Sequence, residues 1–215
     1  MYKAILIASF LIFTDVPAQV IAPVRIHYQG GGDWYGNKTT WKNILAEARK
    51  RLGMPTAPRE TSAKIEDPEF SQSPIAYLAG HGNVVFDDQE AAILRRYLTR
   101  GGFLFADDDY GMDRSFRRAM KKVFPELDFT PLPFSHPIYH AVYDFNNGLP
   151  KVHEHAGGPP QGLGLIYEGR LVCFYSFNTD ISDGCEDAQI HKDPESVRGQ
   201  ALKMALNILV YALTN

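Results

Sequence analysis

Two short and almost uninterrupted apolar runs constrain this chain most, PIAYLAG at residues 74–80 and FLFAD at residues 103–107. Apolar runs of this length, bounded by glycine and polar residues, are typical of strands that are buried on both faces. A helical pattern separates the two runs. It begins with a capping box at Asp87 and Glu90 and ends at Gly101. Strand, helix and strand in this order predict parallel strands joined by a crossover helix, and therefore an α/β protein.

The same alternation of apolar runs and amphipathic patterns extends along most of the chain. An irregular stretch rich in proline, histidine and tyrosine, residues 131–161, interrupts it. Together these features predict one domain over residues 19–215, a three-layer α/β sandwich with a mostly parallel sheet. The further expected elements are strands at 24–29, near 63–65 and at 163–176, the last a hairpin turning at Glu168-Gly169, and helices at 39–53, 113–125 and 196–213.

The first eighteen residues differ in character from the rest. Lys3 precedes an apolar run over residues 4–13, which is too short to span a membrane, and small residues lead up to Ala18. This arrangement predicts a secretory signal peptide at residues 1–18, cleaved after Ala18, and an exported protein, periplasmic or secreted, without a membrane anchor. The alternative interpretation is a buried first strand or helix.

Charge and cysteine content exclude several classes of protein. The formal net charge is -3 and no long basic run is present, so nucleic acid is not an expected partner. The two cysteines, Cys173 and Cys185, lack the spacing of a zinc site or a redox motif. We expect both to be free thiols.

Polar residues gather at the ends of the expected strands. QGGGDWYGN, GHGN, DDDYG and SFNTD each follow an apolar strand run, at residues 29–37, 80–83, 107–111 and 176–180. In open parallel sheets, ligands bind beyond the carboxyl ends of the strands. These four segments are therefore expected to face one crevice.

Three consecutive aspartates, Asp107, Asp108 and Asp109, are the most unusual of these features. Capping of the next helix by Asp109 or Asp113 would explain one or two of them. Close carboxylates also suit a divalent cation or a hydroxyl-rich ligand, and they can serve as acid and base. We favour a site, in which Asp108, Asp109 and His81 are candidate catalytic residues and Asp107 is a candidate ligand-binding residue.

Further ligand-binding candidates come from other strand ends. Asp33, Trp34 and Tyr35 follow the first strand and combine one acid with two flat rings, a common way to hold sugars or other polar ligands. The glycines beside them have neither the Walker spacing nor the dinucleotide-binding spacing, so this segment does not predict a nucleotide site.

Four more residues are candidates for lining the crevice. Arg170 lies at the hairpin, and Ser176 lies at a strand end without the G-x-S-x-G context of a serine hydrolase. His136 precedes a proline, which restricts its backbone, and Tyr139 follows in the same HPIY segment.

The His-Glu-His segment at residues 153–155 has two interpretations. His153 and His155 would share one face of an extended chain and could bind a metal ion. We favour the other interpretation, a polar loop that covers the domain.

Several motifs occur together in an order that resembles a known family. They are YQGGGDWY, YLAGHGNVVFDDQE, LRRYLTRGGFLFADD, HPIY, GRLVCFYS and NILVYALT. The chain resembles bacterial domain-of-unknown-function family 4159 over roughly residues 24–214, and that family is similar to the class I glutamine amidotransferase-like superfamily. The resemblance implies a flavodoxin-like three-layer fold and leaves the biochemical role open.

The superfamily also bears on the three aspartates. Its amidotransferases carry a nucleophilic cysteine in a Gly-x-Cys-x-Gly pattern at a tight turn from strand to helix. Here Asp109, Tyr110 and Gly111 match the Cys-x-Gly positions. The resemblance thus implies an exposed carboxylate where the superfamily keeps its reactive group. No Cys-His-Glu triad is recognisable, so thiol chemistry on glutamine is not expected.

Three functions remain open from the sequence. The leading hypothesis is binding of a small polar ligand, either a saccharide or a divalent cation, at the Asp/His crevice. The second is a hydrolase that uses an aspartate as base or nucleophile, or a metal ion that activates water. The third is a non-catalytic scaffold that presents the irregular segment to a protein partner.

Overall fold

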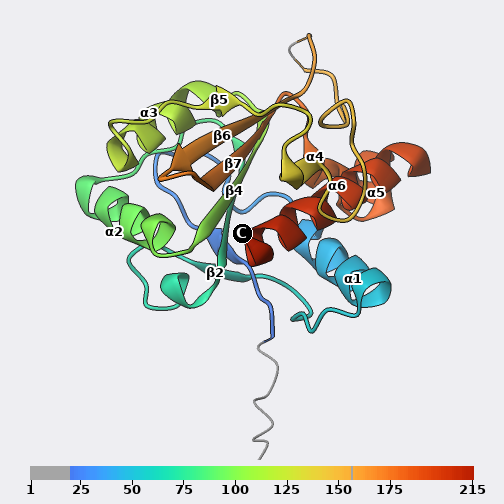
Figure 1. Cartoon of the computed structure of the whole chain (residues 1–215), viewed down its shortest axis with the longest axis horizontal. Helices are drawn as coiled ribbons and strands as arrows, with labels where there is room; N and C mark the ends of the chain where they lie inside the picture. The colour runs from blue at the N-terminus through green and yellow to red at the C-terminus, as the bar shows by residue number, and fades with distance from the viewer. Residues whose placement is uncertain (1–19, 156) are drawn as a thin grey trace, which may run out of the picture.

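The computed structural model describes residues 20–155 and 157–215, so the predicted signal peptide lies outside the described residues. A seven-stranded sheet with the order β2-β1-β3-β4-β7-β6-β5 forms the centre of the molecule (Figure 1). The first five strands in this order are parallel, and β6 runs antiparallel to both of its neighbours. The strands are β1 (Val24–Ile26), β2 (Thr61–Ala63), β3 (Ile75–His81), β4 (Phe103–Tyr110), β5 (Thr130–Pro131), β6 (Gln161–Tyr167) and β7 (Arg170–Phe177).

Helices cover both faces of this sheet (Figure 1). Side chains of α2 and α3 pack on one face in one apolar core, and side chains of α1 and α6 pack on the other face in a second core. The mixed α/β fold with a mostly parallel sheet is therefore confirmed. The helices are α1 (Thr40–Leu52), α2 (Asp88–Thr99), α3 (Asp113–Val123), α4 (Ile181–Gly184), α5 (Ala188–His191) and α6 (Glu195–Thr214), with 3-10 turns η1 (Phe70–Gln72) and η2 (Pro137–Tyr139).

Local sequence signals explain where several elements begin and end. Asp87 and Glu90 form the predicted capping box of α2, each side chain bonding to the backbone of the other. Gly53 ends α1 in the left-handed conformation, with φ of 65°. Glu168 and Gly169 both have positive φ, 49° and 80°, as the tight turn between β6 and β7 requires.

Strand β4 is longer than the sequence indicates. It continues to Tyr110, so the three aspartates lie inside the strand and do not follow it. Neighbouring strands on both sides explain the extension, because Asp108 pairs with Gly80 of β3 and Asp107 pairs with Ser176 of β7. Consecutive residues of a strand point to opposite faces of the sheet. Asp107 therefore lies on the α1/α6 face and Asp108 on the α2/α3 face, and the register shift between β3 and β4 leaves Asp109 without a partner residue in β3.

Two short helices of the C-terminal part were not evident from the sequence. Helices α4 and α5 lie between β7 and α6, where the sequence predicted no element. Cys173 and Cys185 are free, as expected, and both are buried.

Among the residues that the structure describes, no helix has the length and apolar character needed to cross a membrane.

Candidate metal site at the carboxyl edge of the sheet

Asp107 is fully buried and well supplied with hydrogen bonds. Its carboxylate accepts from the hydroxyl of Ser176 and from the backbone N–H of Ser182 at 2.6 Å. Burial raises the pKa of Asp107 to about 7. Ser176, a predicted ligand-binding residue, is itself fully buried and is engaged by this carboxylate.

Asp108 has a structural task. It accepts hydrogen bonds from the backbone N–H of Met112 at 2.9 Å and from the hydroxyl of Tyr175 at 3.2 Å. The carboxylate that holds the beginning of α3 is therefore Asp108, whereas the sequence pointed to Asp109 or Asp113 for this role. Asp113 instead pairs with Arg117 through its Oδ1 at 2.6 Å.

Asp109 differs from both of its neighbours. Its side chain is fully buried, and neither carboxylate oxygen has a hydrogen-bond partner among the described residues. Burial raises the pKa of Asp109 well above its ordinary value, and the charges of Asp107 and Asp183 add to this effect. The expectation of an exposed carboxylate at a tight turn is thus wrong, because β4 carries Asp109 into the interior.

Two histidines from the irregular segment meet an aspartate beyond the end of β7. His153 Nδ1 lies 3.1 Å from Asp180 Oδ2, and His155 Nε2 contacts the same oxygen. One donor atom from each of these three residues lies within 4.8 Å of the others. Two imidazoles and one carboxylate at this spacing can bind a divalent transition metal. The preferred interpretation of His153 and His155 as a covering loop missed this convergence.

A second group of donors adjoins the first. His153, Asp183 and His191 also have donor atoms within 4.8 Å of one another. His191 Nε2 lies 3.0 Å from Glu186 Oε2, and His153 Nε2 lies 3.1 Å from Asp193 Oδ1. Hydrogen bonds from His153 to the carboxylates of Asp180 and Asp183 raise the pKa of His153 to about 10.

The backbone around Asp180 is strained. Asn178 and Asp180 both adopt positive φ, 58° and 61°, a conformation that costs energy for residues other than glycine. Asp180 Oδ1 is buried and has no hydrogen-bond partner among the described residues. Asn178 anchors the adjoining irregular segment, because its side-chain amide donates to the carbonyl of Gly157 and its side-chain oxygen accepts from Lys151. The strained turn therefore holds both the aspartate and the histidine-bearing segment.

A cavity of about 290 Å³ opens beside these donors. His155 and Asp180 belong both to the first donor group and to the wall of this cavity. A larger cavity of about 770 Å³ has no histidine, aspartate or glutamate in its described lining, and it includes Gly102 at the opposite edge of the sheet. The smaller cavity is lined by Asp108, Asp109, Tyr110, Gly111, Asp113, Arg114, His155, Phe177, Asn178 and Asp180.

Asp33 and His81 come together at the same edge, as the sequence suggested. His81 Nδ1 lies 3.1 Å from Asp33 Oδ2, and the backbone N–H of His81 donates to Asp33 Oδ1. The ring of Trp34 stacks on His27 at 3.7 Å between centroids, whereas Tyr35 is exposed. These residues do not line the 290 Å³ cavity.

Arg170 lies away from this edge. Its guanidinium donates to the carbonyls of Gly102 and Leu98, at the beginning of β4 and the end of α2. Because Arg170 begins β7, it occupies the amino edge of the parallel strands. The assignment of Arg170 to the crevice is therefore wrong.

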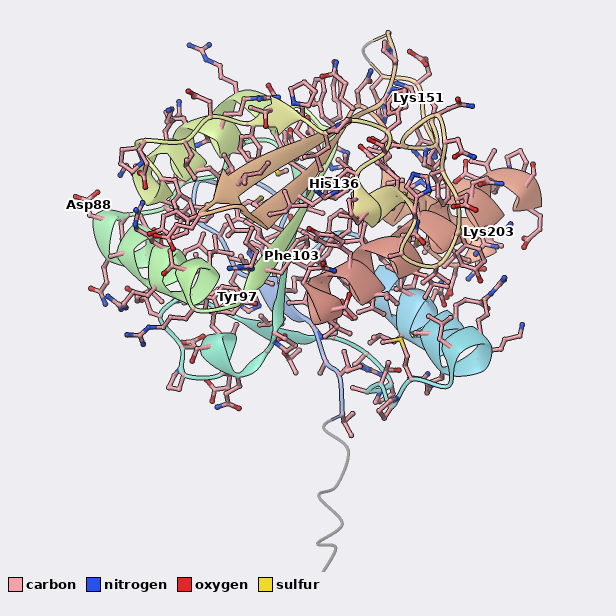
Figure 2. All side chains as sticks on the ribbon, in the orientation of Figure 1. Asp88, Tyr97, Phe103, His136, Lys151 and Lys203 are labelled. Atoms are coloured by element: carbon pink, nitrogen blue, oxygen red, sulfur yellow. The ribbon has the colours of Figure 1, made fainter. Side chains whose placement is uncertain are left out.

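His136 and Tyr139 also lie away from the cluster. The ring of His136 accepts a hydrogen bond from the backbone N–H of Ile138. Its centroid lies 5.4 Å from that of the Tyr211 ring, and Tyr211 also packs against Phe103 at the start of β4. Tyr139 is buried against β6 and β7. Figure 2 shows His136 well apart from Lys151, which bonds to Asn178 at the carboxyl edge.

Comparison with known families gives one match. A family model described as "Domain of unknown function (DUF4159)" matches residues 21–213. No curated protein matches the chain.

Proposed function

The chain belongs to the DUF4159 family, and we propose that it binds a divalent transition metal ion through His153, His155 and Asp180. The observation that carries this proposal is the convergence of three donor atoms within 4.8 Å, one of them on an aspartate whose other oxygen is buried without a partner. A buried and unpaired carboxylate oxygen is costly, and a bound cation would offset that cost.

The ligand set favours zinc and its transition-metal neighbours over magnesium and calcium. Imidazole nitrogens suit Zn²⁺, Fe²⁺, Ni²⁺ and Cu²⁺, whereas Mg²⁺ and Ca²⁺ prefer sites made of oxygen ligands. Asp183 and His191 stand next to the first three donors and would support the coordination as outer partners of His153. The strain at Asp180 is consistent with a residue held in place for binding.

We further propose that the chain is an exported member of the class I glutamine amidotransferase-like superfamily. In this member the thiol nucleophile has been lost. The mostly parallel sheet, with helices on both faces, supports the superfamily. Asp109 stands near the end of β4, and both cysteines are buried elsewhere. A metal site in place of thiol chemistry is consistent with an aspartate at the position of the nucleophilic cysteine.

Calorimetric titration of the chelator-treated full chain with ZnCl₂ tests the proposal. We expect at least one zinc ion per chain, and a much weaker response to MgCl₂. His155→Ala should weaken zinc binding by about 100-fold or more, since even outer partners of metal ligands contribute 10- to 100-fold. His140→Ala is the matched control, because the partly buried His140 pairs with the exposed Asp144 elsewhere. Equal zinc affinity in the two variants, or no zinc binding by the wild type, would contradict the proposal.

A further inference from the structure

We propose that this metal site is catalytic and hydrolyses the ester or amide bond of a small, uncharged acyl compound held in the 290 Å³ cavity, with Asp109 as the proton acceptor. This inference rests on the metal-binding function proposed above, and it adds a reaction, a substrate class and a role for the buried aspartate.

The cavity gives the metal site an open side. His155 and Asp180 face both the donor group and the cavity, so an ion held by them would border space that is large enough for water and a substrate group. Structural zinc sites are closed by four protein ligands, whereas catalytic sites keep three ligands and one open position. The first donor group has three members, which fits the catalytic pattern.

Asp109 forms part of the wall of that space. It lines the cavity, it is fully buried, and neither of its oxygens has a partner among the described residues. It belongs to neither donor group, so it is not positioned as a ligand of the same ion. A carboxylate without partners beside a metal site is a suitable acceptor for a proton from water. The other two aspartates of β4 are engaged by Ser182, Met112 and Tyr175.

The lining of the cavity disfavours a negatively charged substrate. Among the described lining residues, four are aspartates and one is an arginine, Arg114, which is exposed. An anionic substrate would be repelled by this wall, whereas an uncharged acyl group would not. Tyr110 and Phe177 supply aromatic surface beside the polar groups. The volume lies at the lower end of the range for small-molecule pockets, which indicates a small substrate.

The reaction consumes one molecule of water. A metal ion at the site would polarise that water and the acyl carbonyl. The water oxygen forms a bond to the acyl carbon, and one of its protons passes to Asp109. The bond from the acyl carbon to the leaving oxygen or nitrogen breaks, and the leaving group takes up that proton. The products are a carboxylic acid and an alcohol or amine, and Asp109 returns to its starting state.

The first test uses the zinc-loaded full chain with two chromogenic probes, the neutral p-nitrophenyl acetate and the anionic p-nitrophenyl phosphate. We expect hydrolysis of the acetate that disappears on chelation and returns with zinc, and hydrolysis of the phosphate at least about 100-fold slower. Wild-type protein that binds zinc but hydrolyses the acetate no faster than metal-free protein would overturn the inference and leave metal binding intact. Preference for the phosphate would overturn the substrate class. Neither result depends on whether a variant folds.

The second test addresses Asp109. Asp109→Asn keeps the shape of the side chain and removes its basicity, so kcat should fall by about 100-fold or more while zinc affinity stays unchanged. Asp109→Ala should give the same pattern. Asp144→Asn, a change at an exposed aspartate in the irregular segment, should keep wild-type kcat. Full activity in Asp109→Asn, or loss of zinc binding in it, would show that Asp109 is not the proton acceptor.

Discussion

Two assemblies of histidine and aspartate occupy the same edge of the sheet, and they differ in burial and in the number of partners. In the Asp33–His81 pair the side chains are 34% and 51% exposed, and one ring meets one carboxylate. In the cluster around Asp180, that side chain is 1% exposed and contacts His153 and His155 together. His153 also reaches Asp183 and Asp193.

The difference shows that exposure to solvent determines whether a set of charged residues requires further partners to offset the cost of burial. Water hydrates the exposed pair, so the pair costs little and contributes little. The buried carboxylates have lost that hydration, and the histidines that face Asp180 offset only part of the cost. The unpaired oxygens of Asp109 and Asp180 mark where compensation is incomplete. Incomplete compensation is a better indication of a binding site than the presence of a histidine beside an aspartate.

The largest expected effect is the pH dependence of stability. Burial raises the pKa of Asp107 from 3.8 to about 7, so the folded state binds this proton more tightly than the unfolded state does. The free energy of unfolding should therefore be highest below about pH 4 for this group and should fall by up to about 4 kcal/mol as the pH rises to 7. Urea unfolding of metal-free protein across this range measures the slope.

Two variants separate the regions in that experiment. Asp107→Asn should flatten the slope, whereas Asp33→Asn leaves Asp107 in place and serves as the matched control in the exposed pair. A slope in Asp107→Asn as steep as that of the wild type would show that Asp107 does not carry the effect.

The next effect concerns zinc affinity. His153→Gln should weaken zinc binding by about 100-fold, equivalent to about 2.7 kcal/mol, because His153 belongs to both donor groups. His81→Gln should leave the affinity unchanged. Competition with a chromophoric chelator measures both. If His81→Gln produced the larger loss, the exposed pair would be the metal site and the comparison would be reversed.

A smaller effect on the free energy of unfolding is expected to have opposite signs at Asp109 and at Asp33. Burial raises the pKa of Asp109, so at pH 8 the wild type must bury a charge or take up a proton on folding, and Asp109→Asn should raise the free energy of unfolding of metal-free protein by about 1–2 kcal/mol. Asp33→Asn weakens the acceptor for the backbone N–H of His81 and should lower it by about 1 kcal/mol. Thermal or urea unfolding of the two variants checks the signs. Destabilisation by Asp109→Asn would mean that the carboxylate has a partner.

The smallest effect is expected for the exposed histidine itself. His81→Ala should change the free energy of unfolding by less than about 1 kcal/mol, since exposed ion pairs contribute little. Urea unfolding of the variant and the wild type measures the difference. A loss of several kcal/mol would show that the exposed pair is stronger than its burial indicates.

The fold followed from the sequence wherever local patterns decide structure. The capping box of α2, the glycine that ends α1 and the Glu168-Gly169 turn are all short-range signals, and the structure contains each of them. The extension of β4 did not follow, because three adjacent aspartates are unfavourable in an isolated strand. Pairing with β3 and β7 overrides that local preference.

The candidate site was only partly accessible from the sequence. The rule that ligands bind at carboxyl ends correctly grouped Asp33, His81 and the end of β7. The same rule excludes Arg170, which begins its strand. His153 and His191 could not be grouped in advance, because the four-residue helices α4 and α5 have no periodic pattern and because burial, which distinguishes Asp180 from Asp33, depends on tertiary packing.

The reversal of direction between β6 and β7 has a consequence for the order of assembly. Because β6 begins at the edge where β7 ends, the hairpin brings the segment before it and the segment after it together. The contacts of Asp180 with His153 and His155 span 27 and 25 residues, whereas Asp33 and His81 are 48 apart and meet across two crossover connections. Contacts that are close in sequence close smaller loops and form sooner. Once this hairpin is in register, residues 153–193 carry the whole donor set, so the cluster can assemble before the parallel strands are complete.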